Sequence, residues 1–319
     1  MTKPPQTLLE AIRYFSDEDV CLGFVKELRW PDGVRCPTCG RDDPRFIATR
    51  RLWECKDKHA RKQFSIKVGT IFEDSPIKLD KWLAAIWLIA NAKNGVSSYE
   101  LARSLGVTQK SAWFMLHRIR LAMQHNSIEK MQGGPVEADE TFIGGKAKNM
   151  HRDRKAKARI KSGGGTSGKT VVFGMLERKG PDGHSTVRAK VVENTRRRAL
   201  LPEIEKNVAP GSFVFTDAHA SYDTVYREYL HSVVDHAESY VRGQVHTNGV
   251  ENFWSLLKRT LSGTYVSVDP FHLWRYIDEQ VFRFNNRKDN DGGRFRRVAA
   301  AILGKRLTYE ELTTVPRPA

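Results

Sequence analysis

The chain has 319 residues, of which 53 are lysine or arginine and 37 are aspartate or glutamate, so its formal net charge is +16. This length suits one sizeable domain with smaller attachments, and the positive charge favours a polyanionic partner such as nucleic acid. The sequence has no apolar run of about eighteen residues and no signal-peptide pattern at its N-terminus, so we expect a soluble cytoplasmic protein with no membrane partner.

Residues 16–72 combine a short helix with a candidate metal site. Ser16 is expected to cap the helix, which ends at the turn Pro31-Asp32-Gly33. Two close pairs of metal-binding side chains follow, and a strand-like segment comes after them: Cys36, Cys39, Cys55 and His59. Zinc takes four such ligands in a tetrahedron, and two close pairs let a small β unit close around one ion. The pattern resembles a zinc ribbon, so we predict that these four side chains hold Zn²⁺.

The second pair of this site leaves an alternative open. Three residues separate Cys55 from His59, whereas the usual zinc-ribbon pair is Cys-x2-Cys. In the alternative, His59 is an exposed histidine of a basic loop, and a three-ligand or vestigial site remains. Four cysteines in a chain of this length are too few for a disulfide framework.

Residues 76–126 have the pattern of a helix-turn-helix. Residues 79–93 carry apolar side chains on nearly every side, as a buried helix does, and two further helices meet at Leu105-Gly106-Val107. The exposed side of the last helix would face the DNA major groove through Thr108, Gln109 and Lys110, with Trp113 or His117 as further candidates. Arg118 and Arg120 would meet phosphates. The alternative is a plain helical hairpin with a solvated basic face.

From residue 133 the pattern changes to alternating strands and helices. A strand near 136–142 is followed by a hairpin over 171–194, a helix, a strand ending at Asp217, a helix over 221–230 and another strand. A helix beginning near Val250 comes next. This order is that of a ribonuclease-H-like α/β fold, a mixed sheet flanked by helices, which we place at residues 133–290. Residues 291–319 are expected to form a C-terminal tail.

Residues 163–170 resemble a Walker-type phosphate loop in spacing only. Residues 163–170 match its spacing, with Gly163, Gly168, Lys169 and Thr170 at the required positions. The segment before them is charged coil, and the segment after them reads as a strand rather than a helix. The strand-loop-helix context that cradles phosphate is therefore missing, and the match is attributed to chance.

Three acids stand at chemically useful places in this order. Asp139 lies on the first strand, Asp217 ends the fourth, and Glu251 lies on the first turn of the late helix. Adjacent strands whose carboxyl ends meet bring the two aspartates together. Three converging carboxylates repel one another unless cations neutralise them, and Mg²⁺ or Mn²⁺ suits oxygen ligands. Two such ions about 3.5–4 Å apart can drive an in-line phosphodiester displacement.

Each acid also has a simpler interpretation. Asp217 could only end its strand, and Glu251 could be a capping-box acid of a helix that starts at Thr247 or Asn248. Alternation along the first strand points Glu140 to the opposite face from Asp139. It leaves Glu137 on the same face as Asp139, so residue pattern alone does not choose between those two.

Several blocks of the chain, in order, resemble DDE-type transposases of bacterial insertion sequences, specifically the ISXO2-like branch with an N-terminal zinc ribbon: WPDGVRCPTCG, VEADETFIGGK, FTDAHASY and HTNGVENFWSLLKR. The resemblance covers roughly residues 16–290. It implies that Asp139, Asp217 and Glu251 are the catalytic, metal-binding triad and that Lys258 touches DNA near the cleaved phosphate.

The same resemblance implies a biological role. Members of this family cut DNA at transposon ends and join the freed 3′ ends to double-stranded target DNA, with transposase multimers bridging the ends. The expected protein is therefore a homo-oligomer on DNA in the bacterial cytoplasm, associated with the nucleoid. Two other classes stay open: a regulatory DNA-binding protein derived from a transposase, and a ribonuclease-H-like nuclease. An intact triad argues against the first, and the second needs neither a zinc ribbon nor a helix-turn-helix.

Overall fold

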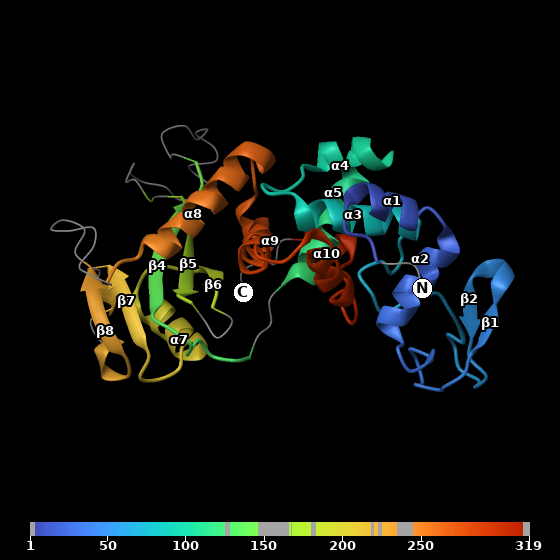
Figure 1. Ribbon diagram of the computed structural model, residues 1–319, viewed down its shortest axis with the longest axis horizontal. Helices are drawn as coiled ribbons and strands as arrows, with labels where there is room; N and C mark the ends of the chain where they lie inside the picture. Colours follow the sequence, from blue (N-terminus) through green and yellow to red (C-terminus); the bar gives the residue numbers. More distant parts are fainter. Residues whose placement is uncertain are drawn as a thin grey trace. The chain divides into compact units, whose positions relative to one another are not determined.

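The computed structural model describes residues 4–124, 128–145, 166, 168–179, 183–217, 220–222, 225–234 and 245–314 (Figure 1). The chain divides into two compact units: residues up to 124 together with those from 286 onward, and residues 125–285. The expected tail at 291–319 is therefore wrong for its described part, because α10 (Asp291–Ala300) and α11 (Tyr309–Thr313) belong to the first unit. The cause is apolar burial, since the ring of Phe295 is 1% exposed and lies 5.1 Å from that of Trp87.

The other α-helices of the first unit are α1 (Leu8–Tyr14), α2 (Glu18–Arg29), α3 (Leu79–Asn91), α4 (Ser98–Leu105) and α5 (Gln109–Met123). The carboxylate of Asp17, rather than the expected Ser16, caps α2 by accepting two backbone N–H groups. Ser97 and Thr108 cap α4 and α5. Gly106, at φ +60°, makes the tight turn between them. None of the described helices is long and apolar enough to cross a membrane.

A small antiparallel sheet carries the cysteine motifs. Its strands are β1 (Arg45–Ile47), β2 (Leu52–Glu54) and β3 (Gln63–Phe64), in that order. The core is aromatic: Trp53 is 4% exposed, and its ring contacts those of Trp30, Phe46 and Phe64. This small sheet buries few apolar residues. We therefore expect metal binding by the cysteine and histidine side chains to supply much of its stability.

The second unit contains a mixed sheet of β4 (Val136–Ile143), β5 (Thr170–Glu177), β6 (Thr186–Val192), β7 (Phe213–Asp217) and β8 (Leu230–Val234). Its strand order is β6-β5-β4-β7-β8. β4, β5 and β6 are antiparallel neighbours, whereas β7 runs parallel to both β4 and β8. This is the ribonuclease-H-like order predicted from the sequence.

Among the described residues, the α-helices of the second unit are α7 (Arg197–Asn207), α8 (Asn248–Thr260) and α9 (Leu273–Asn285). The helix expected over 221–230 is wrong for its described residues, which form two 3-10 turns, Ala220–Tyr222 and Val225–Arg227, before β8. Tyr222 and Val225 are both 1% exposed. Both side chains belong to the apolar core between α7 and β4, so burial of these two residues accompanies the short turns.

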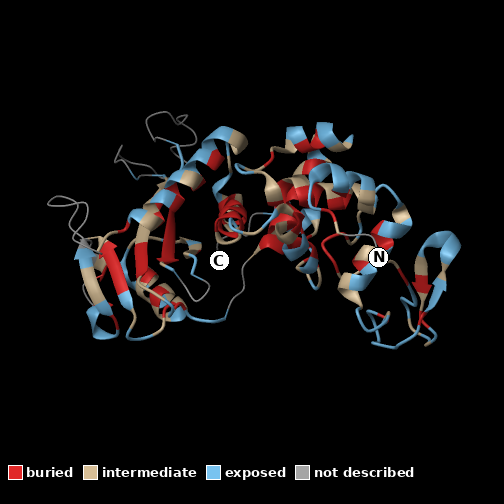
Figure 2. Ribbon diagram, viewed as in Figure 1, coloured by how far each residue is buried: buried red, intermediate tan, exposed pale blue. Residues whose placement is uncertain are grey.

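Two separate apolar cores cover the two faces of this sheet. One joins α8 and α9 to β5 through residues such as Val172 and Leu257, and the other joins α7 to β4 through Val136 and Ala138. In Figure 2, buried and exposed residues alternate along α8, as expected of an amphipathic helix lying on a sheet. Because Val136 and Ala138 face α7, the alternate residues of β4 face α8. Those alternate residues include Glu137 and Asp139.

Candidate metal centres

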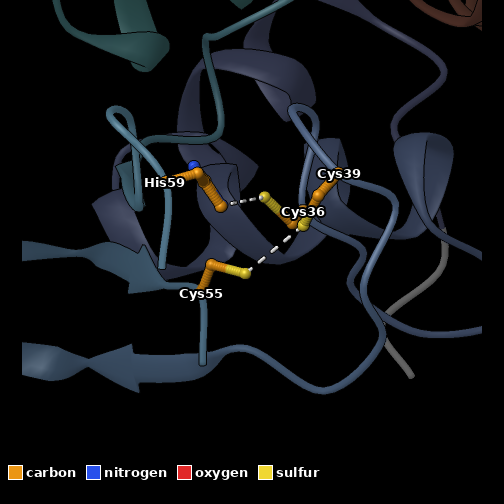
Figure 3. Close-up of side chains that lie close together, drawn as sticks. All are labelled: Cys36, Cys39, Cys55 and His59. Atoms are coloured by element: carbon orange, nitrogen blue, oxygen red, sulfur yellow. Dashed lines mark hydrogen bonds between the residues drawn. The ribbon is translucent and has the colours of Figure 1, made fainter. Parts of the chain in front are cut away.

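The first candidate centre is the cysteine and histidine set of the first unit (Figure 3). The ligand atoms of Cys36, Cys39, Cys55 and His59 all lie within 4.8 Å of one another. Cys36 Sγ is 3.4 Å from His59 Nε2, and Cys39 Sγ is 3.6 Å from Cys55 Sγ. Tetrahedral zinc with Zn–S bonds of about 2.3 Å separates two sulfurs by about 3.8 Å. The four residues therefore fit one zinc ion, and His59 joins the set as predicted.

Backbone hydrogen bonds shape the two turns that carry the four zinc ligands. The first two ligands flank a turn in which Gly40, at φ +77°, donates its N–H to the carbonyl of Cys36. Cys55 follows β2, and its N–H is donated across the turn to the carbonyl of Lys62. His59 lies within that turn, so both ligand pairs stand on chain reversals that face each other.

The second candidate centre lies on the α8 face of the large sheet. In the parallel pair β4–β7, Glu137 is in register with Phe215. Continuing that register by two residues places Asp139 beside Asp217 on the same face. α8 packs on this face, and its first turn carries Glu251. All three acids are half-buried.

The charges of the other two acids act on Asp139. Burial raises the pKa of Asp139 to about 6, and the charges of Asp217 and Glu251 also raise it. Hydrogen bonds from the Trp254 indole and from the Glu140 backbone act in the opposite direction and lower this pKa. A cation at this place would relieve the repulsion, so the donor set has the chemistry that Mg²⁺ or Mn²⁺ prefers.

The acids are spread more widely than the zinc ligands. Among the described residues, no further group of three or more His, Cys, Asp or Glu side chains comes as close together as the cysteine and histidine set. A single small ion needs its ligands within one coordination shell. Two ions about 3.5–4 Å apart need a wider set, and this is the case that we consider for the three acids.

Two neighbouring glutamates have other partners. Glu140 lies on the opposite face beside Tyr222, as alternation predicts; burial raises the pKa of its carboxyl to about 8, and the Tyr222 hydroxyl acts against this rise. Glu137 is 1% exposed. One of its oxygens accepts a hydrogen bond from Arg178 Nε, and the other accepts one of 2.8 Å from the N–H of Val250. Both oxygens of Glu137 therefore accept hydrogen bonds from the protein itself.

The start of α8 differs from the capping-box alternative. Thr247 occupies the N-cap position, and its hydroxyl donates a hydrogen bond of 2.8 Å to Glu251 Oε1. The Val250 N–H in the first turn is capped from β4 by Glu137 instead. Sequence reasoning could not find this cap, because its two partners are separated by 113 residues.

Lys258 is exposed on α8, two turns after Glu251. Ser255 lies between them, with its hydroxyl donating to the carbonyl of Glu251. Val250, Trp254 and Leu257 form the buried stripe, as predicted. The acid and the lysine therefore share a side of the helix that borders that stripe, and the role of Lys258 in DNA contact stays a prediction.

The helix-turn-helix predictions have mixed outcomes. Lys110 is exposed, and its Nζ lies 4.6 Å from the centre of the Tyr309 ring. Gln109 is half-buried and donates to Ser98 Oγ at 2.8 Å. Their contact with DNA stays a prediction, as does the DNA-binding role of α4 and α5.

The expectation that Arg118 and Arg120 meet phosphates is wrong for this conformation. Arg118 is 4% exposed and Arg120 is 1% exposed. The Arg118 guanidinium donates to the carbonyls of Ile71, Glu73 and Leu307. Segments before and after α5 along the chain bury the second half of this helix, whereas Lys110 in its first turn is exposed.

Comparison with known proteins identifies the family. The ISXO2-like transposase domain model matches residues 130–285, and the transposase zinc-ribbon domain model matches residues 16–61. An uncharacterised protein in transposable element ISH50 of Halobacterium salinarum is 28% identical over 79% of this chain and 85% of its own length. An uncharacterised transposase-like protein of Haemophilus influenzae is 35% identical over 30% of this chain and 78% of its own length.

The fold, the ligand set and these matches define a transposase with a zinc ribbon ahead of a ribonuclease-H-like domain. The chain belongs to the family of ISXO2-like transposases of insertion sequences. Its Cys3His set is the zinc site of that ribbon.

The zinc site yields a direct prediction. The purified chain should carry one zinc ion, and Cys36→Ser should lose it, because three remaining ligands leave the tetrahedron open. His59→Ala should lose the ion as well, which separates four ligands from the three-ligand alternative. Cys21→Ala is the matched control, since Cys21 is buried in α2 and its thiol donates to the carbonyl of Phe15. Metal analysis of each variant is the measurement, and zinc retained by His59→Ala would support three ligands.

A second prediction concerns the acids. Mg²⁺ or Mn²⁺ should raise the thermal unfolding midpoint of the second unit, because a ligand that binds only the folded state stabilises it by about 2.7 kcal/mol at a hundred times its Kd. Asp217→Asn should remove most of this shift. Glu228→Gln, at an exposed acid, should keep it. Equal shifts in the parent and in Asp217→Asn would contradict the proposed ligand set.

Proposed function

We propose that this transposase is a DDE enzyme that binds transposon ends, cleaves phosphodiester bonds by metal-dependent hydrolysis and transfers the 3′ ends to target DNA. One observation carries the proposal. The register of the parallel strands β4 and β7, continued two residues past the pair Glu137–Phe215, brings Asp139 beside Asp217 on the sheet face against which α8 packs. The charges of Asp217 and Glu251 both raise the pKa of Asp139, which supports this arrangement.

The role of each side chain follows from its position. Asp139, Asp217 and Glu251 would hold Mg²⁺ or Mn²⁺. When bound, the divalent ions lower the pKa of a water or a 3′-hydroxyl and stabilise the leaving oxygen. Cleavage forms a bond between a water oxygen and phosphorus and releases the 3′ oxygen of the broken strand. In strand transfer, that 3′-hydroxyl attacks a target phosphodiester in turn, so no side chain becomes covalently attached to DNA.

The remaining features supply a reason for DNA binding. Lys258 stands on the exposed side of α8 near Glu251, where an ammonium group would meet a phosphate beside the cleaved bond. The zinc ribbon and the first turn of α5, with Gln109 and Lys110, are the parts we assign to end recognition. The net charge of +16 supports a double-stranded DNA partner. Homo-oligomers that bridge two ends complete the proposal.

The cleavage step is tested with a labelled duplex that carries the inverted repeats flanking the gene. The full chain with Mg²⁺ should nick this duplex at the repeat ends, and Asp217→Asn or Glu251→Gln should lower the rate by at least about a thousandfold, because the barrier would rise by roughly 4 kcal/mol. Glu228→Gln should cut like the parent. If Glu251→Gln also cuts like the parent, the mechanism is wrong. Binding without nicking by the parent would favour a regulatory DNA-binding protein, and nicking of RNA–DNA hybrids alone would favour a nuclease.

The contact of Lys258 is tested by its salt dependence. Lys258→Ala should weaken binding to all duplexes and reduce the slope of log affinity against log salt by about one, because one phosphate contact is lost. Lys206→Ala is the matched control, since Lys206 is exposed on α7, the helix of the other sheet face. Identical slopes for the two variants would remove Lys258 from the DNA interface.

A further inference from the structure

Trp254 makes a contact that apolar packing does not require. The residue is 4% exposed and lies in the buried stripe of α8. Its indole Nε1 donates a hydrogen bond of 2.8 Å to Oδ2 of Asp139 on β4. Helix burial alone would be satisfied by phenylalanine, whereas only a donor such as the indole N–H can hold a carboxylate oxygen.

The sheet leaves room for this indole. Gly174 of β5 stands directly across from Asp139 in the antiparallel register. A Cβ at Gly174 would come 2.4 Å from Trp254 Cη2 and 2.6 Å from Cζ2, far inside contact distance. Glycine in the middle of an apolar strand weakens that strand and marks a close approach of another group. Here the approaching group is the ring that reaches Asp139.

The contact also determines which oxygen lone pairs of the Asp139 carboxylate stay available for a cation. A carboxylate has about four lone-pair sites on its two oxygens, so the hydrogen bonds from the indole and from the Glu140 backbone leave sites for a cation. Trp254 stands three residues after Glu251 on the same helix. One rigid element therefore carries the third acid and orients the first.

We propose that Trp254 is a positioning residue, which holds the Asp139 carboxylate in the orientation that binds a divalent cation. Gly174 leaves the space that the Trp254 ring occupies. This inference rests on the proposed function, because it assumes that Asp139 is a metal ligand. Groups that orient a metal-binding carboxylate alter metal affinity by about 10–100-fold when they are removed. The effect of Trp254 is expected in that range.

The test measures metal binding rather than activity. Mn²⁺ binding to the full chain is followed by electron paramagnetic resonance for the parent, Trp254→Phe and Trp274→Phe. Trp254→Phe keeps a ring on Gly174 but removes the donor, so its Mn²⁺ dissociation constant should rise about tenfold. Trp274→Phe, on α9, should bind like the parent, and zinc content confirms that each variant keeps its first unit. Unchanged Mn²⁺ affinity in Trp254→Phe overturns the proposal.

A measurement on the parent covers the case in which Trp254→Phe does not fold. The chain has 7 tryptophans, so its indole N–H resonances can be followed by NMR during a Mg²⁺ titration. One resonance should shift as the Asp139 carboxylate binds the cation, and none should shift in Asp139→Asn. Saturable Mg²⁺ binding without any indole shift overturns the role of Trp254 alone. If the parent binds no more divalent cation than Asp217→Asn does, the proposed function is wrong, whatever the role of Trp254.

Discussion

The geometry of the second unit depends on the buried carboxylate of Glu137, which fixes α8 on β4. It pairs with Arg178 and caps the first turn of the helix at Val250. Gly249 permits the approach, because a Cβ there would lie 2.9 Å from both carboxylate oxygens. A buried charge is tolerated only when it is paired and fully hydrogen-bonded, and the positive end of the helix adds to the attraction. The guanidinium of Arg178 also lies over the Phe215 ring, so β4, β7 and α8 meet at one ion pair.

Once α8 is fixed on β4, the alternation of side chains along this strand gives each of its acids a different environment. Glu137 and Asp139 point to the same face but meet different partners: an arginine and a helix end for the first, an indole and two other acids for the second. Glu140 points to the other core, beside Tyr222. The three acids of this strand therefore differ by what faces each of them: Glu137 holds the helix, Asp139 is a metal ligand in our proposal, and Glu140 is half-buried beside Tyr222.

The sequence was sufficient for the parts that local pattern determines. The order of strands, the zinc ligands and the separation of Glu251 from Lys258 all follow from periodicity and spacing, and the structure agrees with them. It was insufficient where a partner is distant in the chain. Arg118 looked like a surface arginine of an amphipathic helix, yet a carbonyl 189 residues later accepts its hydrogen bond. The cap on Val250 from Glu137 and the indole contact to Asp139 likewise span more than a hundred residues.

The charge distribution gives the proposed chemistry an order of events. A chain with a net charge of +16 attracts DNA from a distance, but Asp139, Asp217 and Glu251 bring three carboxylates together on one face. Arg178 does not offset this, because its charge is already paired with Glu137. A phosphate approaching the acids would meet repulsion unless divalent cations had neutralised them first. Cation binding before phosphate engagement is thus what the electrostatics of this face favour.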